Sequence, residues 1–215
     1  MRLARLLPRP ELLRRALRLE VLSLFWVLTE VVVGVIAAQR AGSLAISAFS
    51  IDSAIELLSG IVLFTRISWE LRSEDSDAIP NIERIASAVV GISLLLLAAW
   101  TAFESGRAFA AASRVETSGI GLALAAVSSL LTPWLARRKR HLGLLLHSHA
   151  LLGDAACSAT CGYMAWTLLT GLVAQWAFGW WWVDAVAALG IVYFITREAW
   201  ESLSSAWTGV AHVHH

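Results

Sequence analysis

Residues Gly143 to Leu172 read GLLLHSHALLGDAACSATCGYMAWTLLTGL, and this stretch decides the fold. A helix needs about 20 mainly apolar residues to cross a bilayer, and this run is long enough. Cys157 and Cys161 lie inside it, four positions apart. On a helix they share one face, about one turn apart. The stretch therefore predicts a membrane-spanning helix that can point two thiols at one bound object.

The rest of the chain has the same apolar character. Of its 215 residues 58% are hydrophobic and 15% are charged, and its mean hydropathy is +0.67, which indicates an integral membrane protein. Six stretches approach the length of a membrane helix: 21–39, 44–65, 85–103, 117–136, 143–172 and 178–196. The sequence predicts an all-α, six-helix transmembrane bundle over 21–203, with a basic cytoplasmic segment at 1–20 and a short His-containing cytoplasmic tail at 204–215.

The basic residues predict the orientation of the bundle. Fourteen of the 17 Lys and Arg residues fall on the side that holds both termini, so we expect both termini in the cytoplasm and the protein in the inner (plasma) membrane. The Leu and Arg residues of 1–20 are consistent either with an amphipathic segment on the membrane surface or with a solvated leader. A net charge of +1 gives no reason to expect a nucleic-acid partner.

A second pair of polar residues has the same spacing as the cysteines. Asp52 and Glu56 lie four positions apart in the second apolar stretch. Two carboxylates and two thiols facing one another would form a four-coordinate site of the kind that zinc and softer divalent ions prefer. Small residues surround both pairs, so the two helices can pack closely.

All ionisable residues within the apolar stretches are acidic: Glu30, Asp52, Glu56, Asp154 and Asp184. Because such residues are costly in a membrane, each is a functional candidate, and carboxylates with no balancing Lys or Arg in these stretches predict a path for cations. Glu30 and Asp154 could relay protons or orient a ligand. Asp154 could equally be a carboxyl that only packs between helices.

The two motifs resemble the signature helices of the cation diffusion facilitator family. Ser43-Leu-Ala-Ile-Ser-Ala-Phe-Ser-Ile-Asp52-Ser-Ala-Ile-Glu56 is similar to its second helix, and Ser148-His-Ala-Leu-Leu-Gly-Asp154-Ala-Ala-Cys157-Ser-Ala-Thr-Cys161 to its fifth. Supporting matches are Glu30-Val-Val-Val-Gly34, Trp182-Val-Asp184-Ala-Val-Ala-Ala and Glu198-Ala-Trp200-Glu201. The resemblance covers about Val21 to Leu203. It implies a six-helix, homodimeric exporter of divalent metals that exchanges them for protons.

The resemblance implies that Asp52, Glu56, Cys157 and Cys161 are the metal ligands. Two departures stand out. The family usually has His and Asp at the two cysteine positions and Asp in place of Glu56, which bears on the ion carried. It also usually has a cytoplasmic metal-binding domain after the sixth helix, whereas this sequence ends at His215, which bears on regulation and dimerisation.

Thiolate ligands favour zinc, cadmium, lead or mercury over manganese, magnesium or calcium. Free thiols in apolar surroundings stay protonated, so an arriving metal must displace protons, and this is a chemical basis for exchange. We expect no permanently bound cofactor, and as partners membrane lipid, the metal ion and protons. His147 and His149 could guide metal inward at the cytoplasmic entrance or could simply be solvated. The end Ala211 to His215 could capture metal weakly or could be an artificial tag.

Two other classes of function compete with export. A thiol-redox membrane protein would cycle Cys157 and Cys161, but redox pairs usually have two intervening residues near a helix start. A metal sensor or partner subunit would have kept the bundle without transporting. The sequence contains no nucleophile–base pair, phosphate loop or dinucleotide signature, so it predicts a secondary transporter rather than an enzyme.

Overall fold

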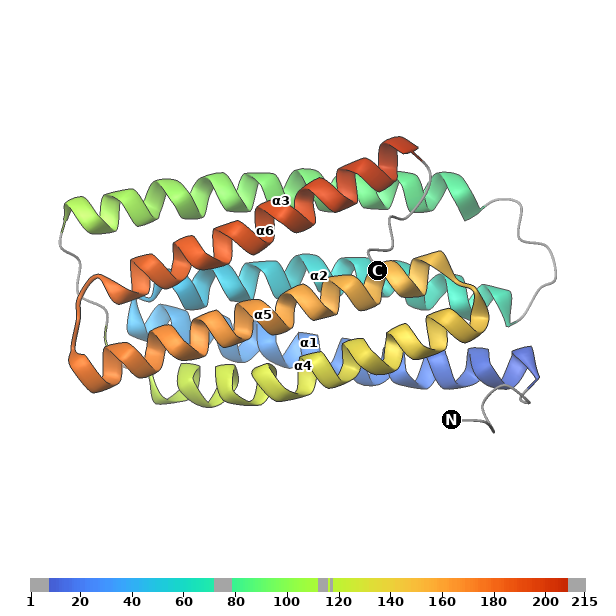
Figure 1. Ribbon diagram of the computed structural model, residues 1–215, viewed down its shortest axis with the longest axis horizontal. Coiled ribbons are helices and arrows are strands. Elements are labelled where there is room, and N and C mark those ends of the chain that lie inside the picture. Colours follow the sequence, from blue (N-terminus) through green and yellow to red (C-terminus); the bar gives the residue numbers. More distant parts are fainter. Residues whose placement is uncertain (1–7, 72–78, 112–115, 117, 209–215) are drawn as a thin grey trace.

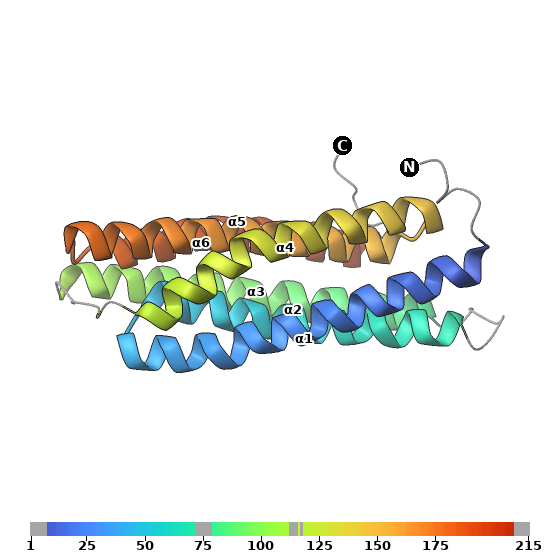
Figure 2. The same cartoon turned by 90° about the horizontal axis from the view of Figure 1, so that it is seen from below.

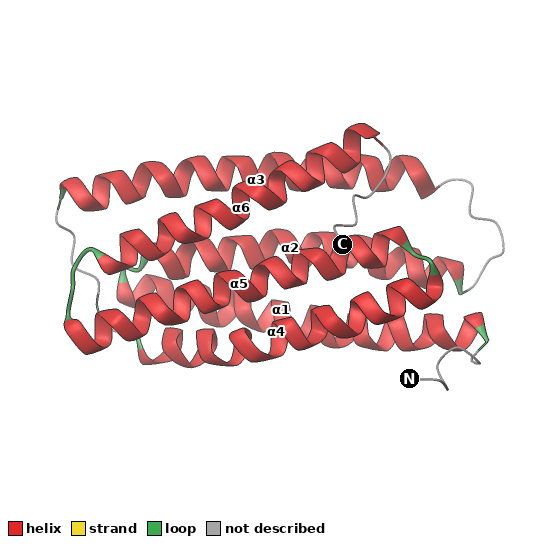
Figure 3. Ribbon diagram, in the orientation of Figure 1, coloured by secondary structure: helices red, strands yellow, loops and turns green. Residues whose placement is uncertain are grey.

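The computed structural model describes residues 8–71, 79–111, 116 and 118–208. Within these residues the chain forms six long helices (Figure 3). The helices are α1 (Arg9–Ala41), α2 (Leu44–Glu70), α3 (Ile79–Ala110), α4 (Gly119–Leu146), α5 (His149–Phe178) and α6 (Val183–Thr208). The predicted all-α, six-helix bundle is confirmed.

The helices run alternately between the two ends of the bundle, so the start of α1 and the end of α6 lie at the same end (Figure 1). Helices α3 and α6 pair along one side, and α1, α2, α4 and α5 group beside them (Figures 1 and 2). Helix α2 contacts α1, α3, α5 and α6, so it occupies a central position. Two helices far apart in sequence, α5 and α6, can therefore both place side chains against α2.

Four helices, α1, α2, α4 and α5, are long and apolar enough to cross a membrane, judged on the described residues. Their outward faces carry large apolar side chains such as Phe25, Leu58 and Leu130, which are 69%, 62% and 70% exposed. In a bilayer these faces contact lipid hydrocarbon chains, which are as apolar as the side chains, so their exposure carries no cost in free energy. The protein is a multi-pass membrane protein.

Close helix contacts depend on small residues. Gly162 of α5 faces Pro133 inside α4, and a Cβ atom there would be 2.8 Å from the Pro133 Cγ. Gly34 of α1 faces Ser50 of α2 in the same way. Without a Cβ atom, each glycine lets two backbones approach, as is typical of membrane helices.

Helix α1 begins earlier than the apolar pattern indicates. Its first helical residue is Arg9 rather than a residue near 21, and Leu12, Leu13 and Ala16 are buried in a small apolar cluster. This cluster includes residues from the ends of α2, α4 and α5. The leucines of the basic segment therefore pack onto the bundle as an extension of α1, with Arg14, Arg15 and Arg18 on the exposed side. Residues 1–7 of the predicted segment lie outside the described residues.

Helix α4 ends later than predicted, so the turn between α4 and α5 also lies later in the chain. The polar run Arg137 to His141 lies between the predicted apolar stretches 117–136 and 143–172, but it is helical, and α4 continues to Leu146. The turn is instead at His147, whose φ of 51° is in the left-handed region, and at Ser148, whose hydroxyl accepts a hydrogen bond from the Leu151 amide. Lys139 is consequently fixed on a regular helix facing inward.

Candidate metal site

Three of the four residues expected to bind metal meet between α2 and α5. The Cys161 thiol donates to Glu56 Oε2 at 2.8 Å and to Asp52 Oδ2 at 3.3 Å. All three side chains are buried. Their meeting follows from the four-residue spacing of Asp52 and Glu56, which stacks both carboxylates on the face of α2 that contacts α5. A sulfur atom thus lies within hydrogen-bonding distance of two carboxylates in the interior of the bundle.

The second oxygen of Glu56 is also held by α5. Ser158 lies one turn before Cys161 on a neighbouring face, and its hydroxyl donates to Glu56 Oε1 at 3.0 Å. Both oxygens of the Glu56 carboxylate therefore face α5. The family usually has Asp at this position, and the longer Glu56 side chain still fits between α2 and α5.

Cys157 has a different partner. Its thiol donates to Oε1 of Glu198 on α6 rather than to either carboxylate of α2. Cys157 is half-buried, whereas Cys161 is fully enclosed. The two thiols of α5 consequently point at carboxylates on two different helices.

The arrangement is one of hydrogen-bonded thiols and carboxylates. In the part of the chain that the structure describes, no group of three or more His, Cys, Asp or Glu side chains is placed so that it could hold a metal ion. A thiol that donates to a carboxylate carries its proton, so these contacts describe a protonated form of the site. A divalent cation that replaced those protons would also offset the carboxylate charges, which are expensive inside a membrane.

Glu30 lies behind the site, between α1 and α4. It is fully buried, and its Oε1 accepts from the Trp26 indole at 2.8 Å and from the Thr132 hydroxyl at 3.4 Å. Its charge is close enough to interact with those of Asp52 and Glu56. Glu30 therefore places another carboxylate near the site, but neither of its two hydrogen bonds involves a cysteine.

Asp154 takes part in a buried cluster of charges, which overturns the expectation that the bundle interior contains no balancing Lys or Arg. Lys139 Nζ lies 2.5 Å from Asp154 Oδ2 and 3.2 Å from Glu20 Oε2, and all three side chains are buried. The cluster joins α1, α4 and α5. Lys139 falls between two of the predicted apolar stretches, whereas it lies on the inward face of α4.

Of the two histidines at the α4–α5 joint, the structure describes the side chain of His147. His147 is exposed and ends α4. His149 is the first residue of α5, and its side chain lies outside the described residues. Their predicted role in guiding metal stays a prediction.

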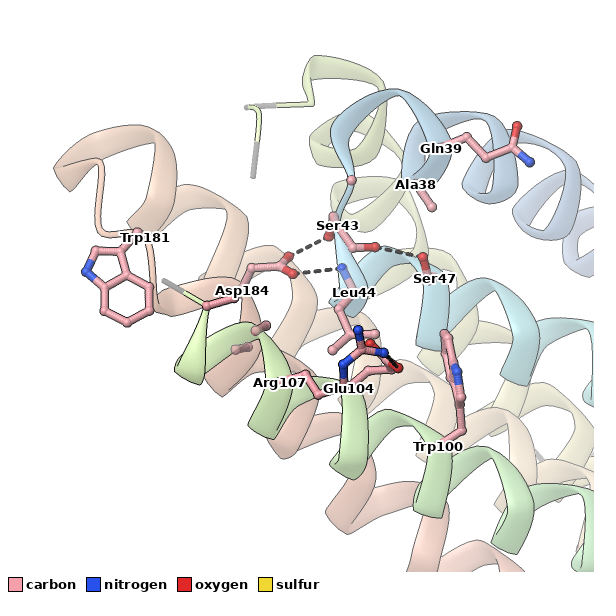
Figure 4. A pocket seen from close by; sticks show the side chains of 14 residues that line it. Ala38, Gln39, Ser43, Leu44, Ser47, Trp100, Glu104, Arg107, Trp181 and Asp184 are labelled. Carbon is pink, nitrogen blue, oxygen red and sulfur yellow. Dashed lines mark hydrogen bonds and ion pairs between the residues drawn. The ribbon is translucent and has the colours of Figure 1, made fainter. Parts of the chain in front are cut away.

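Asp184, the remaining acid of the apolar stretches, has a structural role at the other end of the bundle. Its carboxylate accepts from the Ser43 hydroxyl and from the Leu44 amide at 2.8 Å, so it caps α2 (Figure 4). It also lines a cavity of about 430 Å³. The wall of this cavity on α2 ends at Ser47, five residues before Asp52, or about 7.5 Å along a helix axis. The cavity thus approaches the α2–α5 site from the end opposite to the start of α1.

Glu198 was not identified as a site residue from the sequence. The sixth apolar stretch was taken to end at residue 196, whereas α6 continues to Thr208. A signal was available: the buried residues Ile191, Ile195 and Ala199 recur at helical spacing, and Glu198 falls on the same inward stripe.

Comparison with known proteins agrees with the resemblance noted in the motifs. A family model described as the cation efflux transmembrane domain matches residues 21–208. The chain is 25% identical over 182 residues to the cation-efflux pump FieF of Shewanella oneidensis, with 81% of this chain and 60% of the relative covered. The chain therefore spans about 60% of the length of that curated relative. Because the family model covers most of its length, this chain belongs to the cation efflux (cation diffusion facilitator) family.

Proposed function

We propose that this protein exports a soft divalent metal ion, zinc or cadmium and by the same chemistry mercury or lead, in exchange for protons. The observation that carries the proposal is the buried contact of the Cys161 thiol with Asp52 and Glu56. The match to the cation efflux family supports the class of activity.

The ligand types support the choice of metal. Asp52 and Glu56 supply oxygen, and Cys161 supplies sulfur once it loses its proton. Cys157, one turn earlier on α5, supplies a fourth group. A mixed set of thiolates and carboxylates suits four-coordinate zinc or cadmium, whereas manganese and magnesium prefer oxygen ligands alone.

The hydrogen bonds support an exchange with protons. A metal that binds to Cys161 must displace the thiol proton now directed at Asp52 and Glu56. Protons that return from the outer side would reverse this step and expel the ion. Binding of metal and binding of protons thus exclude each other at the same atoms.

Transport into inverted membrane vesicles under an imposed proton gradient tests the proposal. We expect gradient-dependent uptake of zinc and cadmium, with less uptake of manganese, and at least about a tenfold loss in Asp52→Asn. Glu11→Gln is the matched control, because Glu11 is exposed and pairs with Arg15 one turn along α1. Absence of metal uptake by the unaltered protein, or equal uptake by Asp52→Asn, would contradict the proposal.

A second variant tests the sulfur ligands. Replacing Cys157 and Cys161 together by serine keeps the size of both side chains and should abolish cadmium transport while the bundle remains folded. Serine hydroxyls lose protons far less readily than thiols and bind soft metals weakly. Retained cadmium transport in this variant would refute the assignment of the cysteines.

The contacts of the two cysteines favour metal binding over thiol-redox cycling. Their thiols donate to acids on different helices, Cys161 to α2 and Cys157 to α6. A redox pair would instead need the two sulfurs to face each other. Mass spectrometry after mild oxidation distinguishes the two functions, because a redox pair would form an internal disulfide readily.

We also propose a homodimer, as the family resemblance implies, in the inner (plasma) membrane, as the distribution of Lys and Arg predicts. The mass of the protein in lipid nanodiscs measures this directly, and a monomer that transports metal would remove dimerisation from the proposal.

A further inference from the structure

We propose that Glu198 of α6 is a further metal-binding residue of the transport site, acting together with Cys157. This inference rests on the proposed function and extends its site from two helices to three. The ligand groups would then be two thiols and three carboxylates, from α2, α5 and α6.

The surroundings of Glu198 point to a ligand. The side chain is 7% exposed, its Oε1 accepts the Cys157 thiol, and its Oε2 is buried without a hydrogen-bond partner among the described residues. A buried carboxylate oxygen without a partner destabilises the fold, and such an atom calls for a reason. A metal ion held by the Cys157 sulfur would lie within reach of this carboxylate and would give it a partner.

Arg197, the basic residue next to Glu198 on α6, pairs with a different acid. Arg197 is adjacent in sequence, but it is exposed and its Nε pairs with Glu201 Oε1 at 3.1 Å. Glu201 is at the surface, with 28% of its side chain exposed. Helix α6 therefore has two acids one turn apart, of which one is neutralised at the surface and the other faces inward to a thiol.

The charges near Glu198 favour a divalent cation. Helix α6 contacts both α2 and α5, and the Glu198 charge interacts with those of Asp52 and Glu56. Three carboxylates that repel one another in the membrane interior are costly unless protons or a cation compensate them. A metal bound by Cys157 and Glu198 would join α6 to the two helices that hold the other ligands.

Cadmium binding to the purified full chain in detergent tests this inference, with Glu198→Gln compared with Glu201→Gln. The glutamine at 198 keeps the shape of the side chain and removes its charge. We expect it to weaken cadmium binding about tenfold or more, while Glu201→Gln binds as the unaltered protein does. Cadmium NMR gives a readout that packing alone would not move, because the chemical shift depends on the sulfur and oxygen atoms bound. We expect a changed shift only in Glu198→Gln.

The outcomes separate this inference from the proposed function. Unchanged affinity and an unchanged cadmium shift in Glu198→Gln, with binding lost in Asp52→Asn, would overturn the role of Glu198 and leave the α2–α5 site standing. No cadmium binding by the unaltered protein would overturn both. If Glu198→Gln does not fold, Glu198→Asp replaces it: the shorter carboxylate should bind cadmium more weakly with a changed shift, and unaltered binding would again refute the inference.

Discussion

Replacing Lys139 by methionine should destabilise the bundle strongly. Lys139 is 1% exposed, and its ammonium is paired with Asp154 at 2.5 Å and with Glu20 at 3.2 Å. Methionine has nearly the same length but no charge, so the change leaves two buried carboxylates without their cation. Removing one partner of a buried ion pair typically costs about 3–5 kcal/mol of the free energy of unfolding. We expect a loss in that range.

The same reasoning predicts a rescue. When Lys139→Met is combined with Glu20→Gln and Asp154→Asn, no charge remains in this three-residue cluster. Replacing a buried ion pair or triad by hydrophobic residues of similar volume is often neutral or stabilising, and the amides used here likewise remove the need to compensate a buried charge. The triple variant should therefore be more stable than Lys139→Met alone, although it lacks all three charges.

Unfolding of the purified protein in mixed micelles with increasing sodium dodecyl sulfate measures these effects, and the 11 tryptophans provide the fluorescence signal. Arg140→Met is the control, because Arg140 is adjacent but exposed, and its loss should change stability by only about 0.5 kcal/mol. If Lys139→Met proved as stable as Arg140→Met, the buried cluster would have no role in holding α1, α4 and α5 together.

Two further substitutions test other contacts by the same unfolding measurement or by hydrogen exchange. Gly162→Val should cost about 1–3 kcal/mol, because its Cβ would be 2.8 Å from the Pro133 Cγ, while Gly153→Val, with no atom within 4 Å of the added Cβ, should be tolerated; equal effects would contradict the close approach of α4 and α5. Asp184→Ala should cost about 1 kcal/mol and speed amide exchange at Leu44, whose amide it caps at 2.8 Å, and unchanged exchange there would refute this capping role.

Much of the fold could be predicted from apolar length and charge bias alone. The membrane restricts a spanning chain to helices, so counting long apolar stretches was enough to find all six. The small residues around Asp52 and Cys161 also indicated that α2 and α5 approach each other. The pattern did not predict the ends of the helices, because the helices continue beyond the apolar stretches into polar residues.

The misplaced helix ends explain why three interior residues, Glu20, Lys139 and Glu198, were missed. Glu20 stands in the predicted basic segment, Lys139 in a basic run and Glu198 after the sixth apolar stretch, so none was counted among the residues inside the membrane. Helical spacing places each on the inward stripe of its helix. Which partner each side chain finds depends on the contacts among helices, as for Cys157, whose position predicted a partner on α2 and whose partner lies on α6.

The cap that Asp184 places on α2 has a consequence for how this bundle can move. Because Ser43 and Leu44 are fastened to the first turn of α6, the two helices share a fixed point at the end opposite to the start of α1. Any tilt of α6 relative to α2 then pivots about this point, and the displacement grows with distance along the helices. Asp52 and Glu56 lie closer to the pivot than Glu198, which is some 14 residues, or about 21 Å, along α6 from Asp184. In such a tilt, the half of α6 that is farther from Asp184 is displaced most.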